Sequence, residues 1–226
     1  MVSYLSWDGG RVLRTGSGED AVRDLTSHPF FMPKRNPHPR ISVLPGDRPA
    51  RIEHVKAQRW KDLELVLEQI DDPHNIGAIL RTCDAVGIQT VHLVYENSKP
   101  PRMAELSFSA MSALKWLDIK KWQNVDECLA DLKKRHLKIK VTVLAPEGKP
   151  QWDIDWREPS AIVMGNESLG ISPAFLKAAD AIVAIPMRGF VQSLNVSVAA
   201  AVVMEEALRQ RLSSKTKIQK SNVQIW

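Results

Sequence analysis

One stretch near the carboxyl end of the sequence, from Ile185 to Arg211, limits the folds open to this chain more than any other. It begins as the end of an apolar strand, passes through a polar loop, and continues as a helix of small apolar residues. A helix that is apolar on all sides is normally buried. We therefore expect the loop from Arg188 to Asn195 to be held between two core elements, a setting in which binding sites often lie.

The sequence before this stretch alternates short apolar runs with segments of helical periodicity. Strands are expected at residues 63–68, 90–94, 117–119, 141–144, 161–164 and 181–185. Helices are expected at residues 51–59, 75–86, 103–116, 125–136, 173–178 and 196–211. This alternation predicts an α/β fold, in which a mainly parallel sheet carries helices on both faces. Ligands bind such sheets beyond the carboxyl ends of the strands.

The sequence divides into a central part and two flanking segments. A length of 226 residues fits one or two domains. Residues 1–50 are rich in Gly, Pro, Arg and Ser, and the prolines between Met32 and Arg40 exclude a helix there. We expect a loosely structured extension at 1–50, a folded domain with an initial basic helix at 51–212, and a basic tail at 213–226.

The two cysteines, Cys83 and Cys128, lie far apart and lack the spacing of a zinc site or a disulfide framework. Cys83 falls on the apolar face of an expected helix, where a free cysteine acts as a small buried hydrophobe. No apolar run is long enough to span a membrane, and the N-terminus lacks the apolar core of a signal peptide. We expect a cytoplasmic protein without bound metal or membrane partners.

Basic residues are concentrated before the first core strand and at the carboxyl end of the sequence, and the formal net charge is +5. Such segments on either side of a compact domain suit the phosphate backbone of a nucleic acid. The candidate contacts are Arg51, Arg59, Arg209 and Arg211. Charge alone favours this interpretation no more than a simpler one, in which both segments are flexible and solvated.

A first polar loop, from Asp71 to Arg81, follows the strand at 63–68. Asn75 can cap the helix that begins there. Gly77 lies one turn before Arg81 on the same helix face and leaves room for a ligand beside it. An ordinary capped helix, with Arg81 paired to Asp84, explains the same residues. A lone histidine in such a loop, His74, is more often structural than a catalytic base.

The second loop, from Gly165 to Gly170, directly follows the strand at 161–164 and holds one carboxylate, Glu167. Its glycines permit unusual dihedral angles and a close approach of the backbone to a ligand. The pattern is not the glycine-rich fingerprint of dinucleotide sites. A tight turn between strand and helix is the alternative interpretation.

In the third loop, Ser193 and Asn195 supply hydrogen-bonding groups, and either can cap the last helix. The amino end of that helix carries partial positive charge and free N–H groups. A core helix with a polar cap is the simpler explanation. Ser193 lacks the strand-turn-helix context of a serine nucleophile.

Taken together, the three loops resemble the three motifs of the SpoU/TrmH family of RNA 2′-O-ribose methyltransferases. The matching residues, in the family's order and spacing, are Asn75-x-Gly77-x-Ile79-x-Arg81, Gly165-x-Glu167-x-x-Gly170, and Ile185-Pro186-Met187 followed by Ser193-Leu194-Asn195-Val196-Ser197. The resemblance covers about residues 51–211. Residues 79–87 and 191–211 look most like the members that methylate the D-loop guanosine at position 18 of tRNA.

The resemblance implies a C-terminal trefoil knot (the SPOUT fold), a homodimer, and S-adenosylmethionine as cofactor. The cofactor would lie bent in the knot. The residues that the resemblance assigns to it are Leu144, Gly165, Ile185, Met187 and Leu194. The apolar side chains among them suit the flat slot that an adenine ring needs.

The implied reaction is attack of a ribose 2′-oxygen on the sulfonium methyl group, and the family places Arg81 at that point. An arginine should not act as a base, because its pKa exceeds 12. We therefore expect Arg81 to grip an RNA phosphate and stabilise the emerging alkoxide. The residues expected to position Arg81 and the ribose are Asn75, Glu167, Ser193 and Asn195.

Other functions remain compatible with these residues. The target can be a ribose of ribosomal RNA or another tRNA position, and a non-catalytic RNA-binding protein can keep the same fold. A dinucleotide-dependent enzyme is disfavoured, because the glycine fingerprint is missing.

Overall fold

The structure of the protein is a computed structural model that describes residues 5–8, 11–14 and 47–215, without 97, 111 and 144–147. The chain forms two compact units, residues 1–43 with Trp226, and residues 44–225. In the first unit, β1 (Leu5–Asp8) pairs antiparallel with β2 (Arg11–Arg14). This hairpin was not predicted from the sequence. The proline-rich segment 32–40 and the tail from residue 216 lie outside the described residues.

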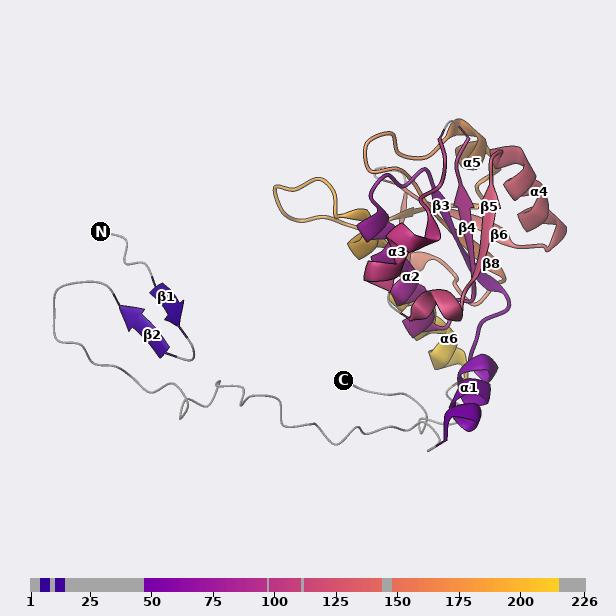
Figure 1. Cartoon of the computed structure of the whole chain (residues 1–226). Helices are drawn as coiled ribbons and strands as arrows, with labels where there is room; N and C mark the ends of the chain where they lie inside the picture. The colour runs from indigo at the N-terminus through magenta and orange to yellow at the C-terminus, as the bar shows by residue number, and fades with distance from the viewer. Residues whose placement is uncertain are drawn as a thin grey trace. The chain divides into compact units, whose positions relative to one another are not determined.

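The second unit contains a seven-stranded sheet in which every pairing is parallel (Figure 1). Its strands are β3 (Leu63–Glu68), β4 (Thr90–Val94), β5 (Asp118–Trp122), β6 (Lys138–Thr142), β7 (Lys149–Pro150), β8 (Ser160–Met164) and β9 (Ala181–Ala184). They are arranged in the order β5-β4-β3-β8-β6-β9-β7. Every residue of β3 and β8 is buried, as expected for strands covered on both faces. The predicted parallel sheet is confirmed.

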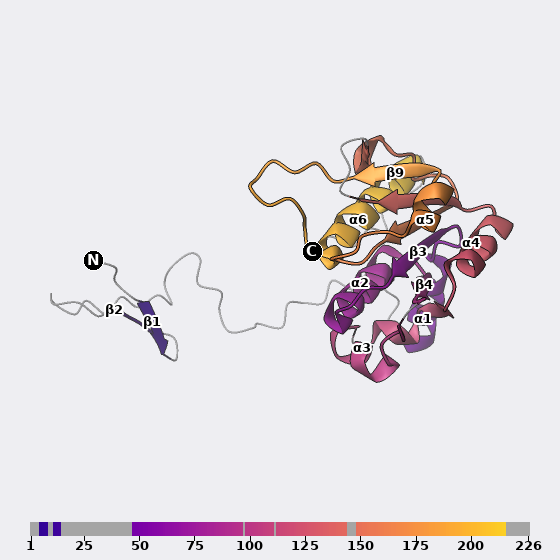
Figure 2. The same ribbon diagram turned by 90° about the horizontal axis from the view of Figure 1, so that it is seen from above.

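Helices cover both faces of the sheet, as predicted (Figure 2). The described helices are α1 (Arg48–Ala57), α2 (Pro73–Val86), α3 (Met103–Ala110), α4 (Val125–Lys134), α5 (Pro173–Ala178) and α6 (Val196–Lys215), with 3-10 turns η2 (Ala113–Lys115) and η3 (Gln151–Asp153). Helix α1 has no buried residue. One face carries α2, α3 and α6, and the other carries α4 and α5. No described helix is long and apolar enough to cross a membrane. The trefoil knot stays a prediction.

Two of the three helix caps predicted from the sequence are confirmed. Ser172 caps α5, and Asn195 caps α6 by accepting a hydrogen bond from the backbone N–H of Ser197 at 2.8 Å. The prediction that Asn75 caps α2 is wrong. Asp72 is the N-cap, because Pro73 occupies the first helical position and the Asp72 carboxylate accepts from the His74 N–H.

The last helix, α6, is buried along one stripe and not on all sides. The buried positions are Val196, Ala200, Val203, Met204 and Ala207, which recur with the period of one helix face. Val198, on another face, is 48% exposed. The prediction that α6 is buried on all sides is therefore wrong, because the face with Val198 is exposed and available for a partner.

Beneath the opposite face of the sheet, a polar network ties β3 and β4 to the end of α4. The buried Glu64 carboxylate accepts hydrogen bonds from Arg135 and, at 2.8 Å, from His92. The other ring nitrogen of His92 accepts from the Trp122 indole N–H at 2.9 Å. Burial alone would raise the pKa of Glu64, but the bonds from His92 and Arg135 hold that pKa below its ordinary value.

Removal of Arg135 should therefore destabilise the fold. Arg135→Met leaves the buried Glu64 charge with only one of its two partners, and we expect the free energy of unfolding at pH 7 to fall by about 2 kcal/mol. The loss should shrink as the pH falls through the lowered pKa of Glu64, because protonation removes the charge that Arg135 stabilises. Urea denaturation at several pH values measures this. Lys134→Met, an exposed change on the same turn, should have little effect at any pH.

Candidate active site

The three motif loops meet at the carboxyl edge of the sheet. The first leaves β3 and leads into α2, the second leaves β8, and β8 pairs directly with β3. The third leaves β9 and projects from the body of the domain before it returns to α6 (Figures 1 and 2). Because α6 packs against α2, the end of the third loop comes back to the first.

Hydrogen bonds link one side chain from each motif. The Asn75 amide nitrogen donates to Glu167 Oε1 at 2.9 Å, and Asn75 Oδ1 accepts from the Asn195 amide at 3.1 Å. The second carboxylate oxygen of Glu167 accepts from the Asp71 backbone N–H at 3.4 Å. The structure thus brings together three residues that the sequence analysis named separately: Asn75, Glu167 and Asn195.

The second loop is shaped by its glycines and by Asn166. A Cβ atom at Gly165 would overlap the backbone carbonyl of Gly170, and Gly170 has a φ of 73°. The buried Asn166 side chain accepts from the backbone N–H groups of Ser168 and Leu169, both at 2.8 Å. The Asn166 amide also donates to the backbone oxygen of residue 69 at 2.6 Å, which joins the second loop to the first.

Asn166 shapes this site and was not predicted from the sequence. Glu167 was predicted because a carboxylate offers chemistry, whereas Asn166 holds the backbone that presents that carboxylate. A second missed residue is Tyr95, whose buried hydroxyl donates to the Ile70 backbone oxygen at 2.6 Å. Burial raises the pKa of Tyr95, and Asp71 and Glu167 add to the rise. The available signal in both cases was a polar residue within two positions of the end of a buried strand.

The other predicted catalytic residues lie around this network. Ser193 is exposed in the third loop, two residues before Asn195. Arg81 is exposed on α2, six residues beyond Asn75. The carboxylate of Asp84, offered as an alternative partner for Arg81, is bound by Arg59.

The predicted cofactor residues gather at the ends of β8 and β9. Gly165 directly follows β8, while Ile185 and Met187 follow β9 and are half-buried, as is Leu194. Leu144 lies outside the described residues. The close approach of Gly170 and Ile171 explains the glycine at position 165, and the apolar half-buried side chains near it suit the adenosyl group of S-adenosylmethionine. No group of three or more metal-ligating side chains occurs in the part of the chain that the structure describes.

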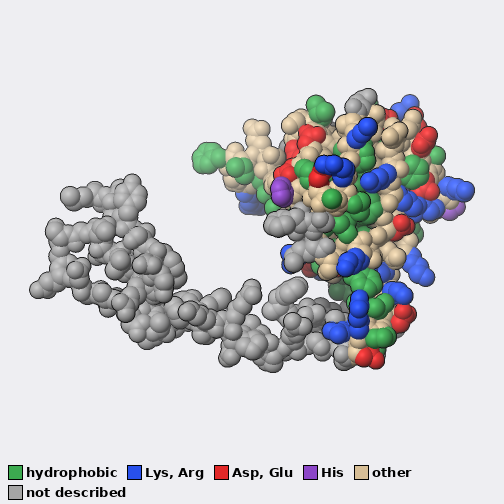
Figure 3. All heavy atoms as spheres, in the orientation of Figure 1, with side chains coloured by type: hydrophobic (Ala, Val, Ile, Leu, Met, Phe, Trp, Pro, Cys, Tyr) green, Lys and Arg blue, Asp and Glu red, His purple; other side chains and the backbone are tan. Residues whose placement is uncertain are grey.

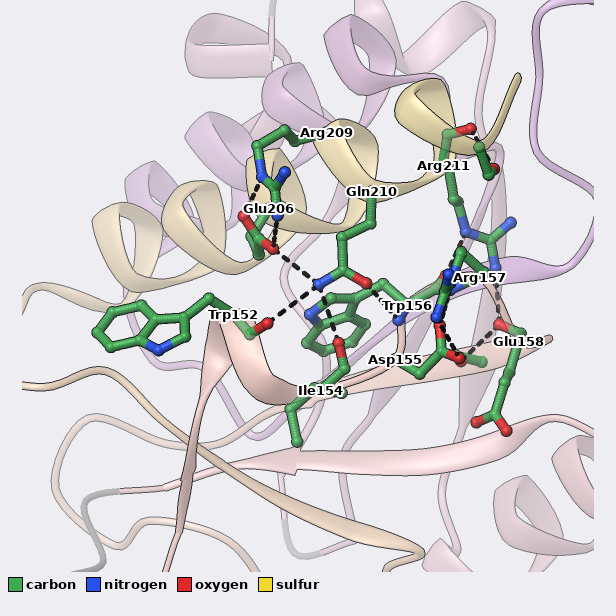
Figure 4. Close-up of polar contacts among 12 residues, drawn as sticks. Trp152, Ile154, Asp155, Trp156, Arg157, Glu158, Glu206, Arg209, Gln210 and Arg211 are labelled. Carbon is green, nitrogen blue, oxygen red and sulfur yellow. Dashed lines mark hydrogen bonds and ion pairs between the residues drawn. The ribbon is translucent and has the colours of Figure 1, made fainter. Parts of the chain in front are cut away.

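Two of the four arginines predicted to contact RNA are instead buried in ion pairs within the domain. Arg211 is 4% exposed, and its guanidinium donates to Asp62 and to the Trp156 backbone oxygen, both at 2.6 Å. Figure 4 shows Arg211 together with Trp156. The Arg59 side chain is also buried, paired with Asp84. Neither can reach an RNA in this conformation, because burial and pairing hold both groups.

The remaining two, Arg51 and Arg209, are exposed. On the face seen in Figure 3, basic side chains are spread among acidic ones and form no single patch. The Arg209 side chain is 60% exposed and paired with Glu206. It lines a hollow of about 460 Å³ together with Trp152 and Arg157. That hollow lies toward the carboxyl end of α6, far from Asn195, so it is not the site of the three motifs.

The fold and the linked loops define an α/β protein in which three motif loops meet at the carboxyl edge of a parallel sheet. Residues 62–205 match the SpoU rRNA Methylase family. The chain belongs to this family. It is 41% identical over 167 residues to the tRNA (guanosine(18)-2′-O)-methyltransferase of Thermus thermophilus. The aligned region covers 74% of this chain and 84% of that relative.

Solved structures agree with this assignment. The A. aeolicus TrmH/SpoU tRNA modifying enzyme matches with a TM-score of 0.68 and 33% identity, over 77% of this chain and 89% of that one. The SpoU methyltransferase AviRb from Streptomyces viridochromogenes, in complex with the cofactor AdoMet, matches with a TM-score of 0.61 and 27% identity. That match covers 66% of this chain and 60% of AviRb.

A single methyl group at Gly165 should damage the site. In Gly165→Ala the added Cβ must displace the backbone at Gly170, so we expect a lower melting temperature and an affinity for S-adenosylmethionine reduced by tenfold or more, a loss of about 1.4 kcal/mol. Calorimetric titration and thermal unfolding measure the two effects. Gly189→Ala is the matched control, because a Cβ there meets nothing within 4 Å. Equal behaviour of the two variants would contradict the steric argument.

Proposed function

We propose that this protein transfers a methyl group from S-adenosylmethionine to the ribose 2′-oxygen of the D-loop guanosine at position 18 of tRNA, in the cytoplasm. The hydrogen-bonded chain Glu167–Asn75–Asn195 carries the proposal, because it joins the three motifs into one site. The identity to the Thermus tRNA enzyme supports the choice of nucleotide.

In the proposed site, the ends of β8 and β9 hold the cofactor. Gly165 provides close backbone contact, and Ile185, Met187 and Leu194 provide apolar surface. The bound cofactor supplies a methyl group on a sulfonium sulfur. Since these residues carry no charge, the reacting charges are left to the residues of the first motif and to Glu167.

Arg81 is the residue we assign to the RNA. A ribose 2′-hydroxyl is a weak nucleophile and must lose its proton, which a solvent water accepts, because a guanidinium cannot. Arg81 therefore binds a phosphate next to the ribose and stabilises the developing negative charge on the 2′-oxygen. The Asn75–Glu167 pair presents fixed acceptors and donors that orient the ribose.

The geometry of α2 supports a homodimer. Six residues separate Asn75 from Arg81, which places them roughly 120° apart around the helix and about 9 Å apart along it. One copy of the chain thus points Arg81 away from its own Glu167 network. A second copy can bring its Arg81 to that network, and the exposed apolar Val198, Phe190 and Val191 offer surface for the contact.

Loss of Arg81 should affect chemistry more than cofactor binding. For Arg81→Ala we expect kcat on tRNA to fall by about 100-fold or more, because one preorganised charge at the reacting oxygen is removed. The affinity for S-adenosylmethionine should change little. Methyl transfer from labelled cofactor and calorimetry measure the two quantities. Arg102→Ala, a change at an exposed arginine on the surface, should retain wild-type turnover. Near wild-type turnover in Arg81→Ala would contradict the role assigned to Arg81 in methyl transfer.

Mixing two inactive variants tests whether two copies build each site. If Arg81 comes from one copy and Asn195 from the other, mixed dimers of Arg81→Ala and Asn195→Ala contain one intact site. Random re-association should then restore about a quarter of the wild-type activity. A site built within one copy gives no recovery, because each site keeps one defect. Sedimentation of both variants confirms that they still associate.

The proposed nucleotide can be checked in RNA from cells. Mapping of 2′-O-methyl groups in a deletion strain should show loss at the D-loop guanosine of tRNA. Loss at a ribosomal RNA ribose, which the family description also accommodates, would move the proposal to that substrate. Full methylation in the deletion strain would favour a non-catalytic RNA-binding role.

A further inference from the structure

Thr142 is the last residue of β6, and β6 lies between β8 and β9. In register, Thr142 is flanked by Met164 of β8 and Val183 of β9. Side chains in register on neighbouring strands share a face of the sheet. Met164 and Val183 both belong to the core beneath α2 and α6, so Thr142 faces that side. Its predecessor, Val141, faces α4 and α5.

The hydroxyl of Thr142 is unsatisfied. Its oxygen is closed to solvent and has no hydrogen-bond partner among the described residues. A buried polar atom without a partner is costly, and in native proteins such an atom usually has a reason for being there. Most other buried polar side chains of this domain are paired, as at Glu64, His92 and Asn166.

The position of this hydroxyl is the second observation. Gly165 directly follows Met164, and Ile185 follows β9 two residues after Val183. Thr142 therefore sits between the two strand ends from which the cofactor residues emerge. In parallel sheets the carboxyl ends of the strands face the ligand.

We propose that the Thr142 hydroxyl is a hydrogen-bond partner of the adenosyl group of S-adenosylmethionine. This inference rests on the proposed cofactor and adds a residue that no motif contains. The neighbours Met164 and Val183 are buried and apolar. Such surroundings suit a nucleobase with a few polar contacts, whereas the zwitterionic end of the cofactor needs charged partners or water.

The test is Thr142→Val, which replaces the hydroxyl with a methyl group of similar size. In the cofactor-free protein the variant removes an unsatisfied group, so its melting temperature should be equal to or higher than that of the wild type. With cofactor the order reverses: the Kd for S-adenosylmethionine should rise by about tenfold, the effect of one lost hydrogen bond. Thr142→Ser, which keeps the hydroxyl, should bind nearly as tightly as the wild type.

Thr82→Val is the matched control. The Thr82 hydroxyl already donates to the Ala78 backbone oxygen at 3.1 Å, so this variant should lose stability and keep its affinity for the cofactor. A second ligand, 5′-methylthioadenosine, lacks the amino-acid end. Thr142→Val should weaken its binding by the same factor as for S-adenosylmethionine.

Three results overturn the proposal, and they distinguish its failure from that of the proposed function. A wild-type Kd in Thr142→Val, or a loss seen with S-adenosylmethionine but not with 5′-methylthioadenosine, removes Thr142 from the adenosyl site and leaves the proposed function intact. Failure of the unmodified chain to bind S-adenosylmethionine overturns both the assignment and the proposed function.

Discussion

The side-chain amide of Asn75 is the point on which the site depends. It donates to Glu167 and accepts from Asn195, so one residue fixes the relative positions of the three loops. An aspartate at this position would repel the Glu167 carboxylate, because both groups are negative, and it would have no N–H group to donate to Glu167. An aliphatic residue would leave both partners without their bonds. A side chain with one donor and one acceptor end meets both demands.

The scaffold explains why the two hydrogen bonds of Asn75 are enough to hold the three loops together. The first two loops leave adjacent buried strands, β3 and β8, and Asn166 ties one loop to the backbone of the other. The third loop is anchored at its far end, where Asn195 caps a helix that packs on α2. Since packed cores are rigid, the three side chains meet without a large loss of conformational entropy. The site is thus built by the fold before any ligand arrives.

The sequence predicted the elements whose signals are local. Six apolar runs became strands of the sheet, and Ser172 before Pro173 marked the start of α5. It failed where two local signals compete, since Asp72 and Asn75 are both good caps and only Pro73 decides between them. The hairpin β1–β2 was missed although Gly9-Gly10 separates its strands in the sequence, a composition that favours two-residue loops.

The larger failures concern partners that are distant in sequence. Arg59 and Arg211 count as basic residues in any composition, yet the fold gives them Asp84 and Asp62 as partners, 25 and 149 residues away. No periodicity reveals such a pair. The motif resemblance named Asn75, Glu167 and Asn195 but carried no information on the bonds that link them. Asn166 acts by binding the backbone of two loops, and Thr142 is marked only by a hydroxyl without a partner. Neither property can be predicted from the residue type alone.

The pairing of Arg211 with Asp62 has a consequence for how the protein is made. Asp62 immediately precedes the first strand of the sheet, and Arg211 lies near the end of the last helix. While the chain is being synthesised, β3 emerges early and must wait for α6 to cover its side of the sheet. Contacts of such long sequence separation close late, because the chain between them must first be ordered. The nascent domain therefore exposes the apolar face beneath α6 until the ribosome has released almost the entire domain.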